Sequence, residues 1–143
     1  MGHALHEAFR VLNPGGCVLD IRPYFPISQG NRRDARQQVY CQVEKEEILV
    51  GTLARDYVDF HFADRVVAEA VRDRRFVVNC HEVIRFRYYH DSLATFDLYR
   101  ADKWDKARMS VSDRRHLERT MLRHPATVIR VDLPVQFRVL TKV

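Results

Sequence analysis

A proline–glycine turn near the start of the chain limits the possible folds more than any other sequence feature. Residues 3–13 carry apolar side chains at helical spacing. Pro14, Gly15 and Gly16 end this helix, because proline cannot continue it and glycine accepts the positive φ of a tight turn. The apolar run 17–21 follows at once and is typical of a buried strand in a parallel sheet. A helix, a tight turn and a buried strand form half of a βαβ unit, so we expect an α/β fold.

The remaining sequence alternates between helical and strand patterns, bounded by turns and prolines. Asp91 and Ser92 offer an N-cap for the helix that follows them, and the side chains of 76–89 alternate as in a strand. The expected elements are a polar loop at 27–37, a hairpin at 38–53, a helix at 62–74, a strand at 76–89, helices at 92–104 and 110–124, and a strand at 126–141. Pro134 lies inside the last strand and indicates a bulge or an edge position. The fold class is therefore α/β, or α+β by content, with a small mixed sheet that contains a parallel strand, an antiparallel pair and a hairpin.

Length and composition favour one domain spanning residues 1–143. The chain is 46% hydrophobic, and no linker or repeat divides it. No apolar run approaches the roughly 18 residues of a membrane span, and no signal-peptide pattern is present. Cys17, Cys41 and Cys80 are an odd number without CxxC spacing, which argues against a secreted disulfide framework. We expect a soluble, cytoplasmic protein without a membrane partner.

The segment HEAFRVLNPGGCVLDIRP resembles the later part of class I S-adenosylmethionine-dependent methyltransferases. In that family a helix ends in an "RvLkPGG" turn that leads into the fifth strand of the sheet, and this chain differs only in having Asn13 where lysine is common. The resemblance implies a partial Rossmann-like fold, with an antiparallel pair of final strands beside the fifth strand. The helices at about 92–124 would be insertions into that fold.

The same resemblance implies that the cofactor-binding half of the fold is absent. The family holds its cofactor with a glycine-rich loop and an acidic residue in the first half of the fold, whereas this chain has five glycines and no GxGxG motif. No residue can be assigned to cofactor binding, and S-adenosylmethionine would bind only if a partner chain supplied the missing half. We therefore expect no catalytic residues and no activity of the chain alone.

A partial sheet leaves one edge of the strand 17–21 without a neighbour, and an apolar open edge favours association. We expect a homodimer, or another protein partner, to cover this edge. The alternative is that the hairpin at 38–53 covers it within the same chain.

The candidate ligand-pocket residues lie at or beyond the ends of strands, where open α/β sheets bind ligands. Asp20, Arg22 and Tyr24 end the first strand, and Tyr89 and His90 end the strand 76–89. Arg22 is suited to clamp a small anionic ligand through a carboxylate or phosphate. The alternative for Arg22 is an ion pair at the surface with Asp20 or Asp34, and the alternative for the aromatic residues is a core or surface packing role.

Two further partners are not expected. The seven histidines show no metal-ligand spacing, so we predict no metal site. The net charge is +5, but arginines and acids are interleaved without a block of like charge, which disfavours nucleic acid. The sequence predicts a methyltransferase-like fragment that binds a small ligand or a protein. The alternatives are the substrate half of a split methyltransferase and an arginine-rich nucleic-acid-binding protein.

Overall fold

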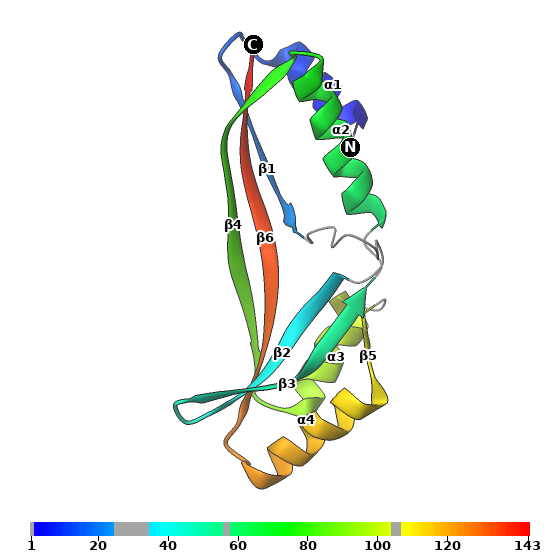
Figure 1. Cartoon of the computed structure of the whole chain (residues 1–143), viewed down its shortest axis with the longest axis vertical. Coiled ribbons are helices and arrows are strands. Elements are labelled where there is room, and N and C mark those ends of the chain that lie inside the picture. The colour runs from blue at the N-terminus through cyan, green and yellow to red at the C-terminus, as the bar shows by residue number, and fades with distance from the viewer. Residues whose placement is uncertain (1, 25–34, 56–57, 104–106) are drawn as a thin grey trace. The chain divides into compact units, whose positions relative to one another are not determined.

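A computed structural model describes residues 2–24, 35–55, 58–103 and 107–143 (Figure 1). Its elements are α1 (Gly2–Val11), β1 (Cys17–Pro23), β2 (Ala35–Val43), β3 (Glu46–Arg55), α2 (Val58–Arg72), β4 (Phe76–His90), α3 (Leu93–Lys103), β5 (Arg108–Met109), α4 (Val111–Arg123) and β6 (Val128–Lys142). All the predicted helices and strands are present among these elements. The short strand β5 had no sequence signal, and most of the expected loop at 27–37 lies outside the described residues.

The described strands form one antiparallel sheet, so the chain is a mixed α/β protein without the expected parallel strand. The strand order is β1-β6-β2-β3-β5, and β4 pairs with β6. β1 runs antiparallel to β6, with Asp20 opposite Arg138. The parallel prediction was wrong because an apolar run between turns specifies a strand but not the direction of its neighbour. The hairpin of β2 and β3 is confirmed, but β2 pairs with β6 and not with β1.

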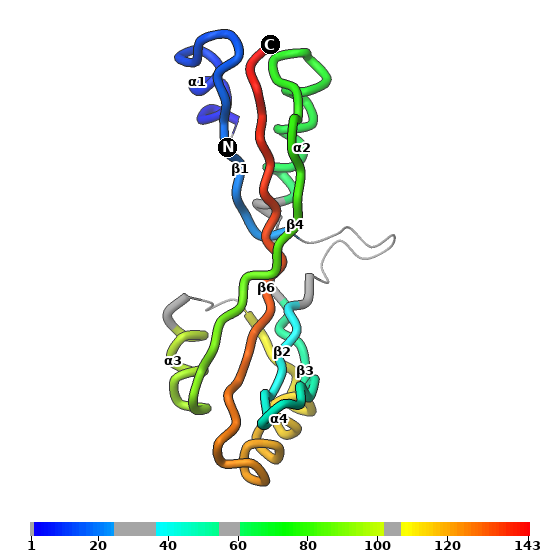
Figure 2. The backbone as a smooth tube through the Cα atoms, turned by 90° about the vertical axis from the view of Figure 1, so that its left-hand side faces the viewer, coloured from blue at the N-terminus to red at the C-terminus, as the bar shows by residue number. Residues whose placement is uncertain are grey.

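The chain divides into two compact units, which are described separately below. The first contains Met1–Tyr24, Tyr57–Ile84 and Pro134–Val143, and the second contains Phe25–Asp56 and Arg85–Leu133. β4 and β6 therefore contribute residues to both units, and Figure 2 shows these two strands running alongside each other. The expectation of a single domain stays a prediction.

In the first unit, α1 and α2 cover one face of the strands β1, β4 and β6 (Figure 1). Leu5 of α1 and Val67 of α2 pack with Phe76 and Leu140 in a buried apolar cluster. The opposite face carries Leu19 and Ile21 of β1, each 59% exposed. The expectation that β1 is buried was therefore wrong for one of its two faces, because the helices that this unit supplies cover only the other face.

The turn between α1 and β1 has the predicted conformation and is held by the last strand. Gly15 has a φ of 78°, and a Cβ on Gly16 would lie 2.9 Å from the carbonyl oxygen of Asn13, so both positions favour glycine. The backbone N–H of Gly15 donates to the carbonyl of Lys142, whose side-chain Nζ donates to two carbonyls at the end of α1. This cation satisfies carbonyl groups that the helix end leaves without partners.

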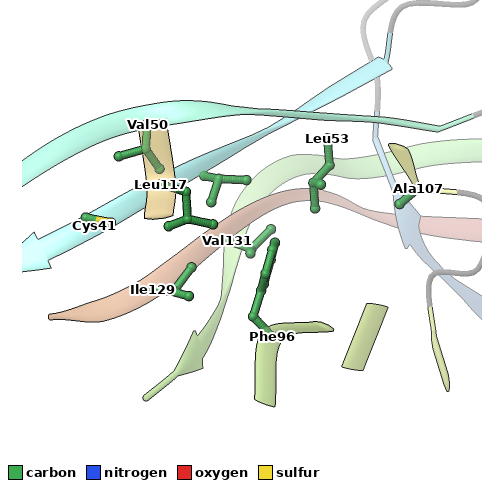
Figure 3. Packing of buried hydrophobic residues seen from close by; sticks show 9 residues of the cluster. Cys41, Val50, Leu53, Phe96, Ala107, Leu117, Ile129 and Val131 are labelled. Atoms are coloured by element: carbon green, nitrogen blue, oxygen red, sulfur yellow. The ribbon is translucent and has the colours of Figure 1, made fainter. Parts of the chain in front are cut away.

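In the second unit, α3 and α4 supply apolar side chains to one core with β2, β3 and β6. Phe96 of α3 and Leu117 of α4 point toward Ile129 and Val131 of β6 (Figure 3). Cys41 lies in the same core, and burial raises the pKa of its thiol to about 11. All three cysteines are free thiols.

β3 and α4 approach each other so closely at Gly51 that this position requires glycine. A Cβ at this position would lie 2.4 Å from the Cβ of Asp113, whose carboxylate accepts a hydrogen bond from the backbone N–H of Thr52 at 3.0 Å. The register of β2 against β3 shifts between Val39 and Tyr40, directly opposite this segment. The helix can thus pack against β3 only where the strand carries no side chain.

Pro134 lies inside β6, which is an interior strand and not the edge that its proline suggested. Along one side of β6, residues 128–132 pair with β2 and residues 135–141 pair with β1. Pro134 falls between these two ladders, where a missing N–H breaks no bond of either. Within the described ranges, no helix is both long and apolar enough to cross a membrane.

Candidate functional site

Two of the candidate ligand residues, Asp20 and Arg22, form a buried ion pair on β1. Residues two apart on a strand share a face, so both side chains point toward the face that the helices cover. The Arg22 guanidinium donates to both carboxylate oxygens of Asp20, at 2.7 and 2.8 Å. Both side chains are more than nine-tenths buried. The pair with Asp20 is the structural alternative for Arg22, but it is buried and not at the surface. The other acid of that alternative, Asp34, lies outside the described residues. The pair occupies much of the guanidinium that a ligand carboxylate would need.

Two neighbouring elements extend this pair into a network of alternating charge. Asp64 of α2 lies 3.1 Å from Arg22 and 3.0 Å from Arg138 of β6. Gln136 of β6 donates from its Nε2 to Asp64 at 3.2 Å, while its buried Oε1 has no partner among the described residues. Two carboxylates and two guanidinium groups balance one another, so the network joins α2 to the sheet without a net charge.

Tyr24 follows β1 and belongs to the same unit. Its backbone N–H donates to the carbonyl of Pro134 at 2.8 Å, and its ring meets the ring of His81 edge to face at 6.1 Å. Of the predicted pocket residues, Asp20, Arg22 and Tyr24 therefore lie in the first unit, and the first two serve the ion-pair network.

Tyr89 and His90 lie in the second unit, where they line a pocket with a volume of about 570 Å³. The pocket lies between the end of β4 and the helix α3. Its lining residues are Tyr88, Tyr89, His90, Thr95, Leu98 and Tyr99. Such a volume falls within the range of small-molecule sites. No carboxylate, ammonium or guanidinium group is among the lining side chains.

Aromatic packing and a helix cap fix the walls of this pocket. The ring of Tyr99 lies 5.2 Å from the ring of Tyr88 and 5.1 Å from that of His90. Ser92 caps the first turn of α3 by accepting from the backbone N–H of Thr95 at 3.1 Å, which confirms the predicted cap. The cap sets where α3 begins and therefore which of its side chains reach β4.

The imidazole of His90 is held in its neutral form. Burial lowers its pKa, and the charge of the neighbouring Asp91 opposes this effect only in part. Its buried Nε2 has no partner among the described residues, and its ring also contacts Phe96 at 5.6 Å. A pocket with three tyrosine rings and a neutral imidazole is suited to a flat, uncharged group.

Sequence reasoning missed the residues that complete each cluster. Asp64, Gln136 and Arg138 join Asp20 and Arg22 only through the β1–β6 register and the docking of α2. Leu98 and Tyr99 have the spacing of an ordinary helix face. No local signal in the sequence distinguishes these residues from structural ones.

Within the described parts of the chain, no group of three or more histidine, cysteine, aspartate or glutamate side chains is arranged to hold a metal ion. Comparisons with protein-family models, with curated proteins and with solved structures found no match to this chain.

Replacing Arg22 by methionine is expected to lower the free energy of unfolding by about 3–5 kcal/mol, because it leaves the buried Asp20 carboxylate without its main partner. Urea denaturation followed by circular dichroism measures this loss. The matched control is Arg10→Met, which removes an exposed ion pair with Glu7 and is expected to change stability by less than about 1 kcal/mol. Equal effects of the two substitutions would contradict the structural role of the network.

Acidification is expected to destabilise the protein through His90. The pKa of His90 is lower in the folded state than in the unfolded state, so the unfolded state takes up a proton more readily. The free energy of unfolding therefore falls as the pH drops below the unfolded-state pKa of about 6.5. Above that pH, His90 contributes no pH dependence. Unfolding measured between pH 7.5 and 5 should show a smaller loss in His90→Gln than in the unchanged protein. The control His116→Gln, at an exposed position, should lose as much stability on acidification as the unchanged protein. A His90→Gln variant with the same loss would show that His90 does not cause it.

Proposed function

We propose that the chain is a methyltransferase-like module that is not catalytic by itself and acts by binding a partner through the open edge of β1. The observation that carries this proposal is the exposure of Leu19 and Ile21 beside an edge that, among the described residues, has no neighbouring strand. An apolar sheet edge of this kind promotes pairing with another chain.

The order of elements supports the methyltransferase likeness. α1, the Pro14–Gly16 turn and β1 follow one another as in the family's helix, turn and fifth strand. The final strand β6 lies beside β1, and β4 pairs with β6, which matches the antiparallel pair that the family places beside its fifth strand. This part of a Rossmann-like sheet needs no parallel neighbour for β1, since in the family that neighbour belongs to the first half of the fold.

We further propose that the partner is a second copy of the chain. The backbone N–H of Tyr24 bonds to β6, so by strand alternation the N–H and C=O groups of Leu19 and Ile21 point toward the open edge. When two β1 strands pair antiparallel about a two-fold axis at Ile21, these outward N–H and C=O groups of one copy meet those of the other. The exposed Leu19 and Ile21 side chains of both copies then lie on one face, so the edge is complementary to itself in hydrogen bonding and in apolar character.

Sedimentation at micromolar concentration is expected to give about twice the chain mass of 16.9 kDa. Ile21→Lys is expected to produce monomers, because it places two lysines opposite each other across the two-fold axis. The control Leu122→Lys makes the same change at an exposed position of α4 and should leave the dimer intact. A monomeric unchanged protein, or a dimer that survives Ile21→Lys, would refute the proposal.

A second candidate function is the substrate half of a split methyltransferase, in which a different chain supplies the cofactor half. The open edge of β1 favours it, because this is the edge at which the family's fourth strand would pair. Co-purification with a glycine-rich α/β protein would distinguish this candidate from a homodimer.

Calorimetric titration with S-adenosylhomocysteine tests whether the chain binds the cofactor alone. No heat is expected, because the described residues contain no glycine-rich loop beside a strand end that could hold the cofactor. A thermal-shift assay with the same ligand provides an independent readout. Micromolar binding would overturn the non-catalytic proposal, and Asp20 and Arg22 would then be the first residues to substitute.

A further inference from the structure

Arginines alternate with aromatic residues along the second-unit part of β4, from Arg85 to Tyr89. Phe86 is 50% exposed, Tyr89 is 54% exposed, and the side chain of Arg87 is 49% exposed. Among the described residues β4 pairs only with β6, so its other edge is open. This leaves both the rings and the arginines accessible from solvent.

The rings continue from the strand into the pocket described above. Phe86 lies 4.9 Å from Tyr88, and Tyr88 lies 5.2 Å from Tyr99 of α3. Tyr89 and Leu98 add exposed apolar surface at the pocket wall. We call these four rings the β4 aromatic row (Phe86, Tyr88, Tyr89, Tyr99). By strand alternation Phe86 and Tyr88 lie on one side of β4, next to Tyr99 of α3, and Tyr89 lies on the other side with the arginines.

The arginines beside this row are less engaged with acids than Arg114 and Arg130 of the same unit. Arg114 is bound in a bidentate pair with Asp97 at 2.7 Å, and Arg130 is bound by Glu47. Arg85, by contrast, has no ion pair within the described residues. Arg87 has a long ion pair with Asp132 at 4.0 Å, and its charge also helps to lower the pKa of Glu47. The structure thus separates paired arginines from arginines that are available to an anion.

The second unit as a whole carries a net positive charge, like the arginines on β4. It contains 16 of the 24 basic and 12 of the 19 acidic side chains of the chain, and it therefore holds most of the +5 net charge. On the exposed face of α4, Arg115, Arg119 and Arg123 follow at four-residue intervals, and no acidic side chain pairs with them in the described parts of the structure. An anionic ligand is attracted to this unit before it reaches any specific contact.

We propose that nucleobases bind the β4 aromatic row and its pocket while their phosphates pass round the open edge of β4 to Arg85 and Arg87 on its other side. Arg85, Arg87 and Tyr89 alternate on one side of the strand, with about 7 Å between successive members. The uncharged pocket accepts a flat base that is not protonated, while the guanidinium groups on the strand bind the phosphate outside it. Unpaired bases suit such rings, because every base presents a π-face that can stack.

A free nucleotide and a single-stranded nucleic acid both offer a flat base and a phosphate. Two arms of one experiment distinguish these two ligands. A fluorescein-labelled oligothymidylate of 12 nucleotides is titrated with the full chain, and binding is followed by anisotropy at 50 and 200 mM salt. Adenosine monophosphate is titrated separately by calorimetry. We expect the oligonucleotide to bind with an affinity that falls several-fold at the higher salt. Binding of the nucleotide with equal affinity would identify the free nucleotide as the ligand.

Matched variants test whether the rings and arginines on β4 carry the binding. Tyr89→Ala is expected to weaken binding about fivefold or more through lost stacking, whereas Phe62→Ala, at an exposed ring of α2, should not. Arg85→Gln is expected to weaken binding more than Arg119→Gln, which removes the same charge from α4. Oligoglutamate, an anion without bases, should compete poorly.

Three results would contradict the proposal that this site binds nucleobases. The first is no binding of either ligand at 50 mM salt. The second is an equal effect of each β4 variant and its control, which would indicate attraction by net charge alone. The third is equal competition by oligoglutamate, which would make an acidic peptide the better ligand. Because the site does not include β1, a monomeric protein that binds the oligonucleotide would refute the dimer and leave this inference intact.

Discussion

The rest of the structure depends on the hydrogen bonding of β6, which pairs with β1, β2 and β4. Leu140 of this strand lies in the core of the first unit, and Ile129 and Val131 lie in the core of the second. Gln136 and Arg138 bring the buried charge network together, and Lys142 binds the end of α1. Both apolar cores and the network on β1 therefore require the same register along one strand, and a slip of one residue would turn every one of these side chains to the wrong face.

Local signals in the sequence were sufficient to place the helices and strands but not to pair them. The proline–glycine turn, the Ser92 cap and the alternation along β4 each depend on a few neighbouring residues, and the structure agrees with all three. The direction of β1, the partner of the hairpin and the exposure of Leu19 depend on contacts between strands that are far apart in the sequence. A short apolar run looks the same whether its neighbours are parallel or antiparallel, and Pro134 looks like an edge residue although it lies between two ladders.

The candidate sites, like the strand pairing, could be predicted from local sequence only in part. Asp20 and Arg22 were expected at the end of the first strand, but both lie within β1, and only the geometry shows that they bind each other and Asp64. Tyr89 and His90 were chosen for their position, and their pocket is completed by α3 residues that have no distinguishing pattern. The arginines were harder still, because their spacing in the sequence does not reveal which of them find acids in space. Arg130 is buried over the ring of Tyr40, whereas Arg85 has no such partner, and both are simply scattered basic residues in the sequence.

The position of β6 in the chain has a consequence for synthesis on the ribosome. All the other described elements precede it, yet it is the neighbour that β1, β2 and β4 require. Translation proceeds from the N-terminus, so these three strands emerge first and wait without their common partner until residue 142 has been added. During that interval the apolar side chains of both cores are exposed to other nascent chains and to chaperones. The assembly of β1, β2 and β4 is thus set by a strand that is made after all three of them.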